Sequence, residues 1–161
     1  MGNCESVQGL GYNTNLVKRE EAPKSSHDLL DAKWKGKMAV SGDSQSANWV
    51  GSLLVTYGEK FVQQMAQQGI VVHMVSARAL CDIISNGEYA LSPTITDAHV
   101  IQNKRKGAPI DWAPLEPVYV TLGQMTLPAY SSHPHAAMLY IDFELSKEAG
   151  VIYKEVGYDS P

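Results

Sequence analysis

The chain has 161 residues and a mass of 17.6 kDa, with 44% hydrophobic and 19% charged residues, which suits one folded domain and excludes a disordered chain. Its net charge of -4 comes from 17 acidic and 13 basic residues, and no basic run is longer than 104–106, so nucleic acid is a poor candidate partner. No apolar run approaches the roughly 20 residues that span a bilayer, so no membrane insertion is predicted.

The predicted elements of the first half alternate between strands and helices. A helical turn is predicted at 26–31, a buried strand at 38–40, a helix from just after the polar loop 41–46 to Gly58, and a helix around 61–65 that ends near Gly69. The β-branched run 70–75 predicts a central strand. Ser76 is expected to cap a helix that ends before Gly87, and a further strand is expected at 89–92.

The second half begins with a predicted helix at 96–106, whose three final cations suit the helix dipole. The segment 108–117 holds three prolines, so it must be extended and cannot lie in the middle of a sheet. Strands are predicted at 118–122 and 125–127, then a helix with Pro134 at its first position and a last helix capped by Ser146. Together the elements predict an α/β sheet with helices on its faces.

Signatures of catalysis are absent from the sequence. It contains no nucleophile elbow, no phosphate-binding loop and no zinc-protease motif, and the Gly9–Gly11 run lacks the third glycine of a dinucleotide fingerprint. Cys4 and Cys81 match neither a zinc nor a disulfide spacing, so two free thiols are expected. We therefore predict no cofactor and no catalytic residues, and a small hydrolase that uses Ser, His and Asp is kept only as an alternative.

Two further patterns have a functional and a structural interpretation. The His-Pro-His run at 133–135 with Asp142 could hold a metal, but the start of a helix at the proline explains the same residues. Asp28 and Asp31 could act as paired carboxylates, but their spacing is also that of residues that cap and turn the chain. We predict no metal site.

Three polar loops each follow a predicted strand: the loop 41–48, Ser76 with Arg78, and Ser92 with Thr94. Ordinary helix capping explains any one of them, but open α/β sheets bind ligands at the carboxyl ends of their strands, where helix N-termini attract polar or anionic groups. The residues predicted to bind ligand are Ser41, Gly42, Ser44, Ser46, Asn48, Trp49, Ser76, Arg78 and Thr94. Arg78 would supply positive charge to an anionic solute, and the hydroxyl groups would supply neutral hydrogen bonds.

A series of motifs runs through nearly all of residues 9–158. It includes Gly11–Val17, Asp28–Asp31, Lys33–Lys37, Asn48–Gly51, Ser76–Leu80, Lys106–Trp112 and His133–Ala137. In order and spacing these motifs resemble the extracellular solute-binding proteins of ABC importers, in the ferric-iron and polyamine branch with the type II periplasmic-binding-protein fold. The resemblance implies a mixed sheet flanked by helices, a periplasmic or extracellular location and an ABC permease as partner. No signal peptide is read in the sequence, so as written the chain would stay in the cytoplasm.

The resemblance also implies a division of the chain. Members of that family are about twice as long and have two lobes, and this chain resembles the second lobe and the segment that returns to the first. Residues 1–117 are thus expected to form a ligand-binding lobe with crossover strands, and 118–161 a return strand and helices. Relatives that bind ferric iron use two adjacent tyrosines beyond the strand that corresponds to 89–92. Leu91–Ile95 occupies that region here, so iron binding by that mode is not expected.

The predicted function is that of a solute-binding module, half the usual length and impaired in transport, that binds a small or anionic solute. The alternatives are a stand-alone or dimeric binding domain and a gene fragment without a transport role. The strand and helix residues of 118–145 are apolar, and in the family they are covered by the first lobe. We therefore predict a homodimer in which a partner chain covers them.

Overall fold

The computed structural model describes residues 2–156, which divide into two compact units. One unit is Val7–Tyr119, and the other combines residues 2–6 with the described residues from Val120 onward. The strands are β1 (Gly2–Asn13), β2 (Ala39–Ser41), β3 (Val71–His73), β4 (Leu91–Thr96), β5 (Ile110–Ala113) and β6 (Tyr119–Gln124). The α-helices are α1 (Ser44–Tyr57), α2 (Glu59–Ala66), α3 (Ala77–Ser85), α4 (Asp97–Arg105), α5 (Pro134–Glu144) and α6 (Lys147–Val156), and three short 3-10 turns lie at Arg19–Glu21, Asp28–Leu30 and Ala32–Trp34.

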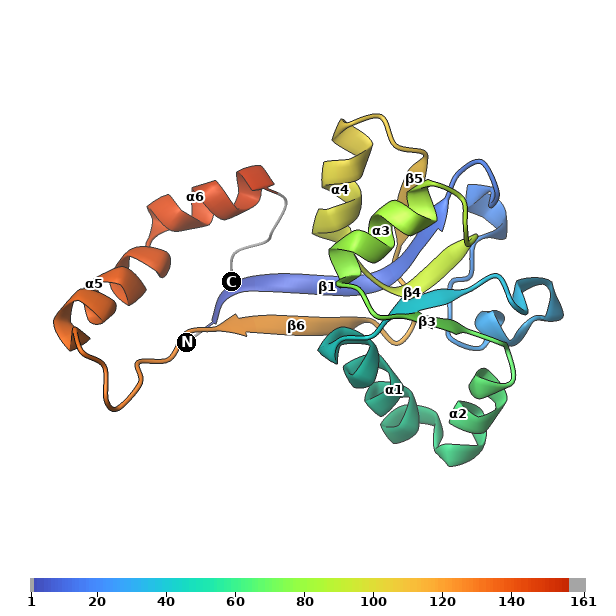
Figure 1. Cartoon of the computed structure of the whole chain (residues 1–161), viewed down its shortest axis with the longest axis horizontal. Helices are drawn as coiled ribbons and strands as arrows, with labels where there is room; N and C mark the ends of the chain where they lie inside the picture. Colours follow the sequence, from blue (N-terminus) through green and yellow to red (C-terminus); the bar gives the residue numbers. More distant parts are fainter. Residues whose placement is uncertain (1, 157–161) are drawn as a thin grey trace. The chain divides into compact units, whose positions relative to one another are not determined.

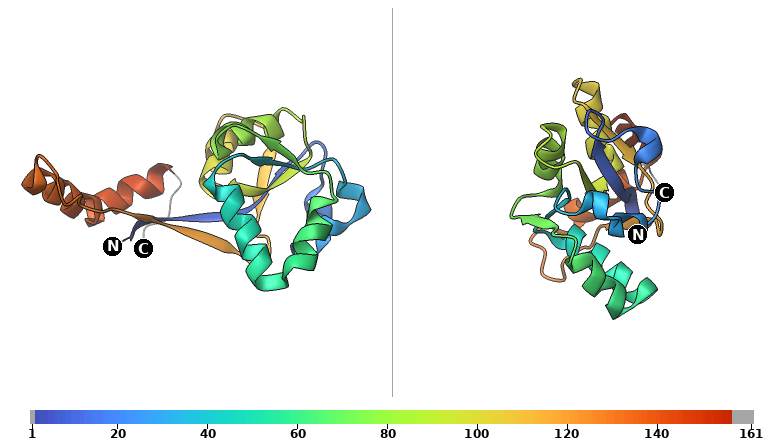
Figure 2. Two further views of the ribbon diagram at one scale, coloured as in Figure 1. Left: turned by 60° about the horizontal axis from the view of Figure 1, so that its bottom comes forward. Right: turned by 90° about the vertical axis from the view of Figure 1, so that its right-hand side faces the viewer.

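The larger unit is a mixed sheet between two layers of helices. Strand β1 pairs antiparallel with β4 on one side and with β5 on the other, and β2 and β3 form a parallel pair. Strand β6, which belongs to the smaller unit except for Tyr119, also pairs with β1. A parallel bridge between Met38 and Leu91 joins the two sheets. Helices α3 and α4 lie on one face, and α1 and α2 lie on the other (Figures 1 and 2). The α/β fold predicted from the sequence, a mixed sheet flanked by helices, is confirmed.

Strand β1 was not predicted, because glycine is a weak strand former and the start of the chain is rich in it. The glycines are needed because side chains from both neighbouring strands lie against the β1 backbone. A Cβ atom on Gly9 would lie 2.6 Å from Trp112 Cζ2, and one on Gly11 would lie 2.8 Å from Ile95 Cδ1. The Gly9–Gly11 run therefore serves close packing inside a strand, and it is not a nucleotide-binding loop.

Strand β4 lies further along the chain than the prediction at 89–92. Its register against β1 shifts, because Gly9 pairs with Ile95 and Gly11 pairs with Ser92. The extra residue forms a bulge that contains Pro93, and a bulge tolerates a residue without an N–H group. Every residue of β4 is buried.

Strand β3 differs in position from the expected central strand. It spans only three residues and forms the outer member of the β2–β3 pair, with Val71 38% and Val72 58% exposed. The predicted central placement was wrong because β-branched residues indicate a strand but not its neighbours. The predicted strand at 125–127 is also absent, since β6 ends at Gln124 and 125–128 has no regular structure.

Two hydrophobic clusters hold the larger unit together. One contains Leu10, Leu53 and Leu91 and includes side chains from α1 and α2, and the other contains Ile84 and Ile95 and includes side chains from α3 and α4. Cys81 lies in the second cluster as a free thiol, and burial raises its pKa to about 12. The prediction for Cys4 falls on a side chain outside the described part of the chain.

The smaller unit contains β6, α5 and α6. Pro134 begins α5 and Ser146 precedes α6, where the Ser146 hydroxyl accepts a hydrogen bond from Ala149 N at 3.3 Å, as the sequence predicts. No residue of α5 is buried, and Tyr153 of α6 donates a hydrogen bond to Glu144 of α5. Among the described residues, no helix combines the length and hydropathy that crossing a bilayer requires.

Candidate functional site

Four hydroxyl side chains form a continuous hydrogen-bonded row across the ends of β2 and β4. Ser46 Oγ lies 3.2 Å from Ser41 Oγ and donates to Thr94 Oγ1 at 3.4 Å. Thr94 Oγ1 lies 3.3 Å from Ser92 Oγ. All four residues are buried, so their hydrogen bonds replace those that water would otherwise supply. The loop after β2 therefore meets Ser92 and Thr94. The prediction that these two residues form a loop after a strand was wrong, because both lie within β4.

The carboxylate of Asp43 links the third loop to this row. Its Oδ1 accepts hydrogen bonds from Gln45 N at 3.1 Å and from Ser41 Oγ at 2.8 Å, so Asp43 is the N-cap of α1. Its Oδ2 accepts from Ala77 N at 3.0 Å, in the first turn of α3. One carboxylate thus satisfies free N–H groups of two helices and fixes α1 and α3 next to each other. Asp43 was not among the residues predicted from the sequence.

A third helix N-terminus, that of α4, differs from these two because the side chain of its N-cap residue, Thr96, makes no capping hydrogen bond. Thr96 pairs with Gln8 across β1 and β4, and both residues are buried, with exposures of 1% and 3%. Within the described chain, neither Thr96 Oγ1 nor either amide atom of Gln8 has a hydrogen-bond partner. Buried polar groups of this kind call for a ligand or an ordered water.

His99 lies in the first turn of α4 and has a lowered pKa. Burial is the largest cause, and the positive charge of Arg78 adds to it, while Asp43 and Asp82 act in the opposite direction. The imidazole is therefore neutral at neutral pH, and its buried Nδ1 has no hydrogen-bond partner among the described residues. A neutral imidazole offers one donor and one acceptor. Sequence reasoning gave no signal for His99, because its spacing to other polar residues matches no motif.

The remaining predicted residues differ in their surroundings. Ser76 caps α3 by accepting from Ala79 N at 3.3 Å, and Arg78 is exposed and donates to Gln102 Oε1. Gly42 lies beneath Met74, whose Sδ would be 2.6 Å from a Cβ at that position. Ser44 and Asn48 are exposed, whereas Trp49 is 6% exposed and packs in the hydrophobic core.

The two alternative patterns from the sequence have structural explanations. The His-Pro-His run begins α5, and no group of three metal-ligating side chains exists among residues 2–156. Asp28 accepts hydrogen bonds from the backbone N–H groups of Lys24 and Ser25, which lower its pKa. Asp31 accepts from Lys33 N at 3.0 Å and caps a 3-10 turn. Both carboxylates thus shape the loop between β1 and β2.

The fold is that of a single lobe of the periplasmic binding proteins. Residues 6–161 match the family of bacterial extracellular solute-binding proteins, and the chain belongs to that family. The resemblance noted in the sequence is confirmed. No curated protein sequence matches the chain at a significant level.

Solved structures share this fold. The periplasmic binding protein P5PA is 22% identical, with a TM-score of 0.82, and the match covers 98% of this chain and 53% of that one. Iron-bound HitA from Pseudomonas aeruginosa is 20% identical, with a TM-score of 0.73 and coverages of 92% and 51%. The sulfate-binding protein SubI from Mycobacterium tuberculosis H37Rv is 16% identical, with a TM-score of 0.74 and coverages of 98% and 57%.

The chain therefore spans about half the length of these proteins, and it matches a single lobe of the periplasmic-binding-protein fold. The family and its structural neighbours are solute-binding proteins rather than enzymes, and the family is related to the binding components of ABC importers.

Proposed function

We propose that the Val7–Tyr119 unit binds a small anionic solute at the N-termini of α1, α3 and α4. The observation that carries this proposal is the pair of buried polar side chains, Gln8 and Thr96, which have no partner within the described chain and adjoin the N-terminus of α4. Asp43 already satisfies N–H groups of α1 and α3. At the start of α4 the Thr96 side chain makes no capping hydrogen bond, and Ala98 N donates to Asp97 Oδ1 at 2.7 Å. The anionic group of the solute is therefore expected nearest to α4.

The other predicted residues would surround that group. Ser41, Ser46 and Thr94 would position the loop through their hydrogen bonds, the exposed Ser44 and Asn48 would donate to the solute, and Arg78 would add positive charge. Gly42 and Ser76 would shape the same edge. Trp49 would act through the core by holding α1 in place. A single wall leaves much of a solute in water, so the Val7–Tyr119 unit by itself is expected to bind weakly.

The test is a thermal-shift and calorimetry series with sulfate and phosphate as probes. Binding should raise the melting temperature, and Thr96→Val should remove most of that rise. This variant is expected to fold, because the Thr96 hydroxyl has no partner among the described residues. Ser52→Ala is a matched loss of a hydroxyl in the middle of α1, where Ser52 bonds only to Trp49 O, and it should leave the rise unchanged. Equal responses in both variants would contradict the proposed site.

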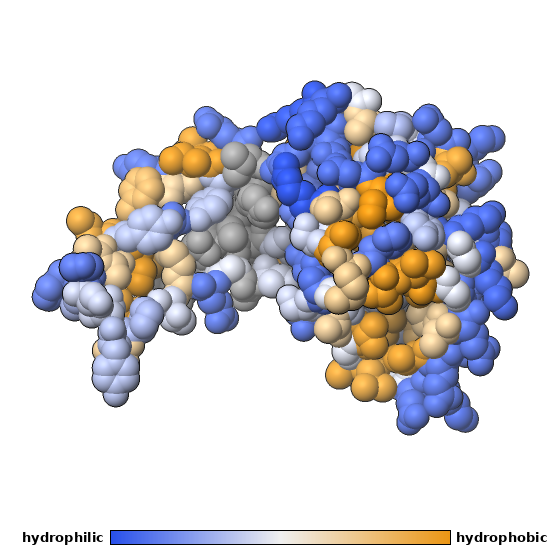
Figure 3. Space-filling view, viewed as in Figure 1, coloured by the Kyte–Doolittle hydropathy of each residue, from blue (hydrophilic) through white to orange (hydrophobic). Residues whose placement is uncertain are grey.

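We also propose that a second copy of the chain covers the smaller unit. The helices α5 and α6 expose large apolar side chains. Part of the surface of these helices is coloured as hydrophobic in Figure 3. These side chains are Met138, Leu139, Tyr140, Phe143, Val151 and Ile152, and each is at least 49% exposed. Burying one such side chain contributes about 1.5–3 kcal/mol, and exposed apolar patches usually mark interfaces. This supports a homodimer, with a stand-alone binding domain as the resulting function.

Sedimentation at micromolar concentration tests the dimer. The wild-type chain should sediment as a dimer, and Leu139→Lys should shift it toward monomer, because Leu139 is 72% exposed and a charge there would have to be buried. Lys154→Ala, on the exposed surface of α6, serves as the control. A wild-type monomer whose α5 is protected from hydrogen exchange would refute the dimer. A monomer with α5 unprotected would favour a fragment without its own function.

A further inference from the structure

A cavity lies beside strand β5, within the Val7–Tyr119 unit. Its volume is about 380 Å³, within the size range of small-molecule sites. The aromatic side chains Tyr12 and Trp112 line it together with the apolar residues Pro23 and Val118. None of the residues proposed above to bind the anionic solute lines this cavity. Tyr12 is four positions along β1 from Gln8, roughly 13 Å at the usual rise of a strand, whereas the Trp112 ring lies beside Gly9 and its Nε1 donates to Ile95 O at 3.2 Å.

Three charged residues also line this cavity: Arg19, Lys24 and Glu116. All three are exposed, which places two cations and one carboxylate at its mouth. Among the described residues, the guanidinium of Arg19 forms no ion pair and no hydrogen bond. A free guanidinium presents a rigid fork of donors that matches a carboxylate.

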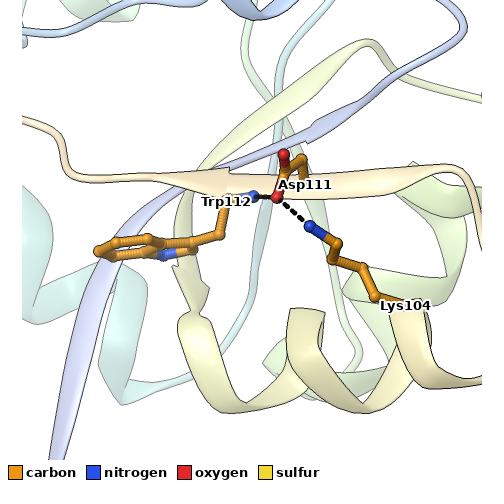
Figure 4. A network of polar contacts seen from close by, with 3 residues as sticks. All are labelled: Lys104, Asp111 and Trp112. Atoms are coloured by element: carbon orange, nitrogen blue, oxygen red, sulfur yellow. Dashed lines mark hydrogen bonds and ion pairs between the residues drawn. The ribbon is translucent and has the colours of Figure 1, made fainter.

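Tyr12 and Asp111 are the titratable groups on which the charge of Arg19 acts. Burial raises the pKa of Tyr12, and the charge of Asp111 adds to this while Arg19 opposes it, so the hydroxyl stays protonated at neutral pH and can donate. Asp111 Oδ1 accepts from Lys104 Nζ at 2.7 Å and from Trp112 N at 2.9 Å, as Figure 4 shows. Lys104 therefore pairs directly with Asp111, and the charge of Arg19 is the smallest of the causes that lower the pKa of Asp111.

We propose that this cavity binds a small organic anion with one carboxylate on an aromatic or branched apolar body. The carboxylate would lie between Arg19 and Lys24, and the apolar body would lie against Trp112, Pro23 and Val118. Glu116 at the mouth disfavours a second negative charge, so monoanions should bind better than dianions.

An adjoining depression of about 470 Å³ shares only Ala22, Pro23 and Lys24 with this cavity. Its lining includes the carboxylates of Glu20, Glu21, Asp28 and Asp31, so it should repel the same anions. These carboxylates should therefore disfavour a monoanion in the depression, so we expect it in the cavity that Arg19 lines.

Nuclear magnetic resonance with benzoate as the probe tests the proposal. The chain has three tryptophans, and Trp112 alone of these lines this cavity, while Trp34 and Trp49 line others. Benzoate should shift the indole N–H signal of Trp112 and leave the other two in place. Because this N–H donates to Ile95 O, beside Thr96, the shift should persist in the Thr96→Val variant if benzoate binds in this cavity. Benzyl alcohol, which has a similar body without the charge, should produce a smaller shift at the same concentration.

Substitutions make the result decisive. Arg19→Ala should weaken benzoate binding about fivefold or more, because an exposed charge-assisted pair is removed. Arg105→Ala removes an exposed arginine at the end of α4 and should leave binding unchanged. Equal shifts of all three indole signals, or equal effects of the two substitutions, would overturn the proposal, as would the absence of any shift.

Discussion

The two units of the chain differ in where their apolar side chains lie. In the Val7–Tyr119 unit they fill two clusters, and side chains such as Leu10, Leu53 and Leu91 are almost fully buried. In α5 and α6 comparable side chains are exposed, and Ala149 is the one buried apolar residue described there. The difference teaches that the first unit has a hydrophobic core of its own, whereas large apolar side chains of α5 and α6 are not covered by any described residue.

The strongest test of this difference removes equal volumes from the two units. Leu91→Ala should destabilise the fold by about 3 kcal/mol, because a fully buried leucine leaves a cavity. Leu139→Ala, at a position that is 72% exposed, should change stability by less than about 0.5 kcal/mol in the monomer. Urea unfolding followed by circular dichroism measures both. Similar losses at the two positions would mean that α5 has a core of its own.

A second test measures how much polar contacts add to the core of the first unit. Asp43→Ala should lower the free energy of unfolding by about 1–2 kcal/mol, because N–H groups of α1 and α3 lose their acceptor. Asp43→Asn should cost less, since its single amide oxygen can still cap one helix. Urea unfolding measures the free energy of unfolding of both variants. If Asp43→Ala is as stable as wild type, water replaces the carboxylate as the acceptor.

A third test uses pH, and a smaller effect is expected. The pKa of His99 is lowered by burial and by Arg78, while the unfolded chain takes up its proton near pH 6.5. The unfolded state therefore binds more protons as pH falls below about 6.5, and stability is lost down to the folded pKa. His99→Gln should flatten this part of the stability profile. A variant with an unchanged profile between neutral pH and pH 5 would contradict the assignment.

The smallest effect is expected from the ion pair between Lys104 and Asp111. Burial acts to raise the pKa of Asp111, but hydrogen bonds from Lys104 and Trp112 N outweigh it and lower the pKa overall. The pair therefore stabilises the fold above the unfolded carboxyl pKa of about 3.9, and this contribution is lost as pH falls through the folded value. Lys104→Ala should cost about 0.5 kcal/mol at neutral pH, because both partners are partly exposed. In acid, the free energies of unfolding of wild type and Lys104→Ala should become equal, and urea unfolding at several pH values measures this.

Local signals in the sequence predicted the helices well. Ser76, Pro134 and Ser146 each stand at the start of a helix, because capping depends on residues within one turn. Strand β1 was missed because its glycines are explained only by Trp112 and Ile95, which are far away in the sequence. The bulge at Pro93 also depends on a partner strand. Contacts between residues so far apart in the sequence cannot be predicted from a local sequence pattern.

The candidate site was predicted in part for the same reason. Small hydroxyl residues after strands indicated the row from Ser41 to Thr94, and the structure brings those side chains into hydrogen-bond contact. The double cap by Asp43 and the pairing of Gln8 with Thr96 join segments separated by more than thirty residues. Whether these residues bind a solute stays a prediction.

The short outer strand β3 has a consequence for the behaviour of the protein at high concentration. Val71 is 38% exposed and Val72 is 58% exposed, so the strand presents apolar side chains at the rim of a sheet. Such rims are where chains stack into fibrils, and a strand of three residues offers little backbone for the growth of a stack. The shortness of β3 is therefore expected to limit pairing between chains at this edge, and sequence changes that lengthen the strand should make the chain precipitate.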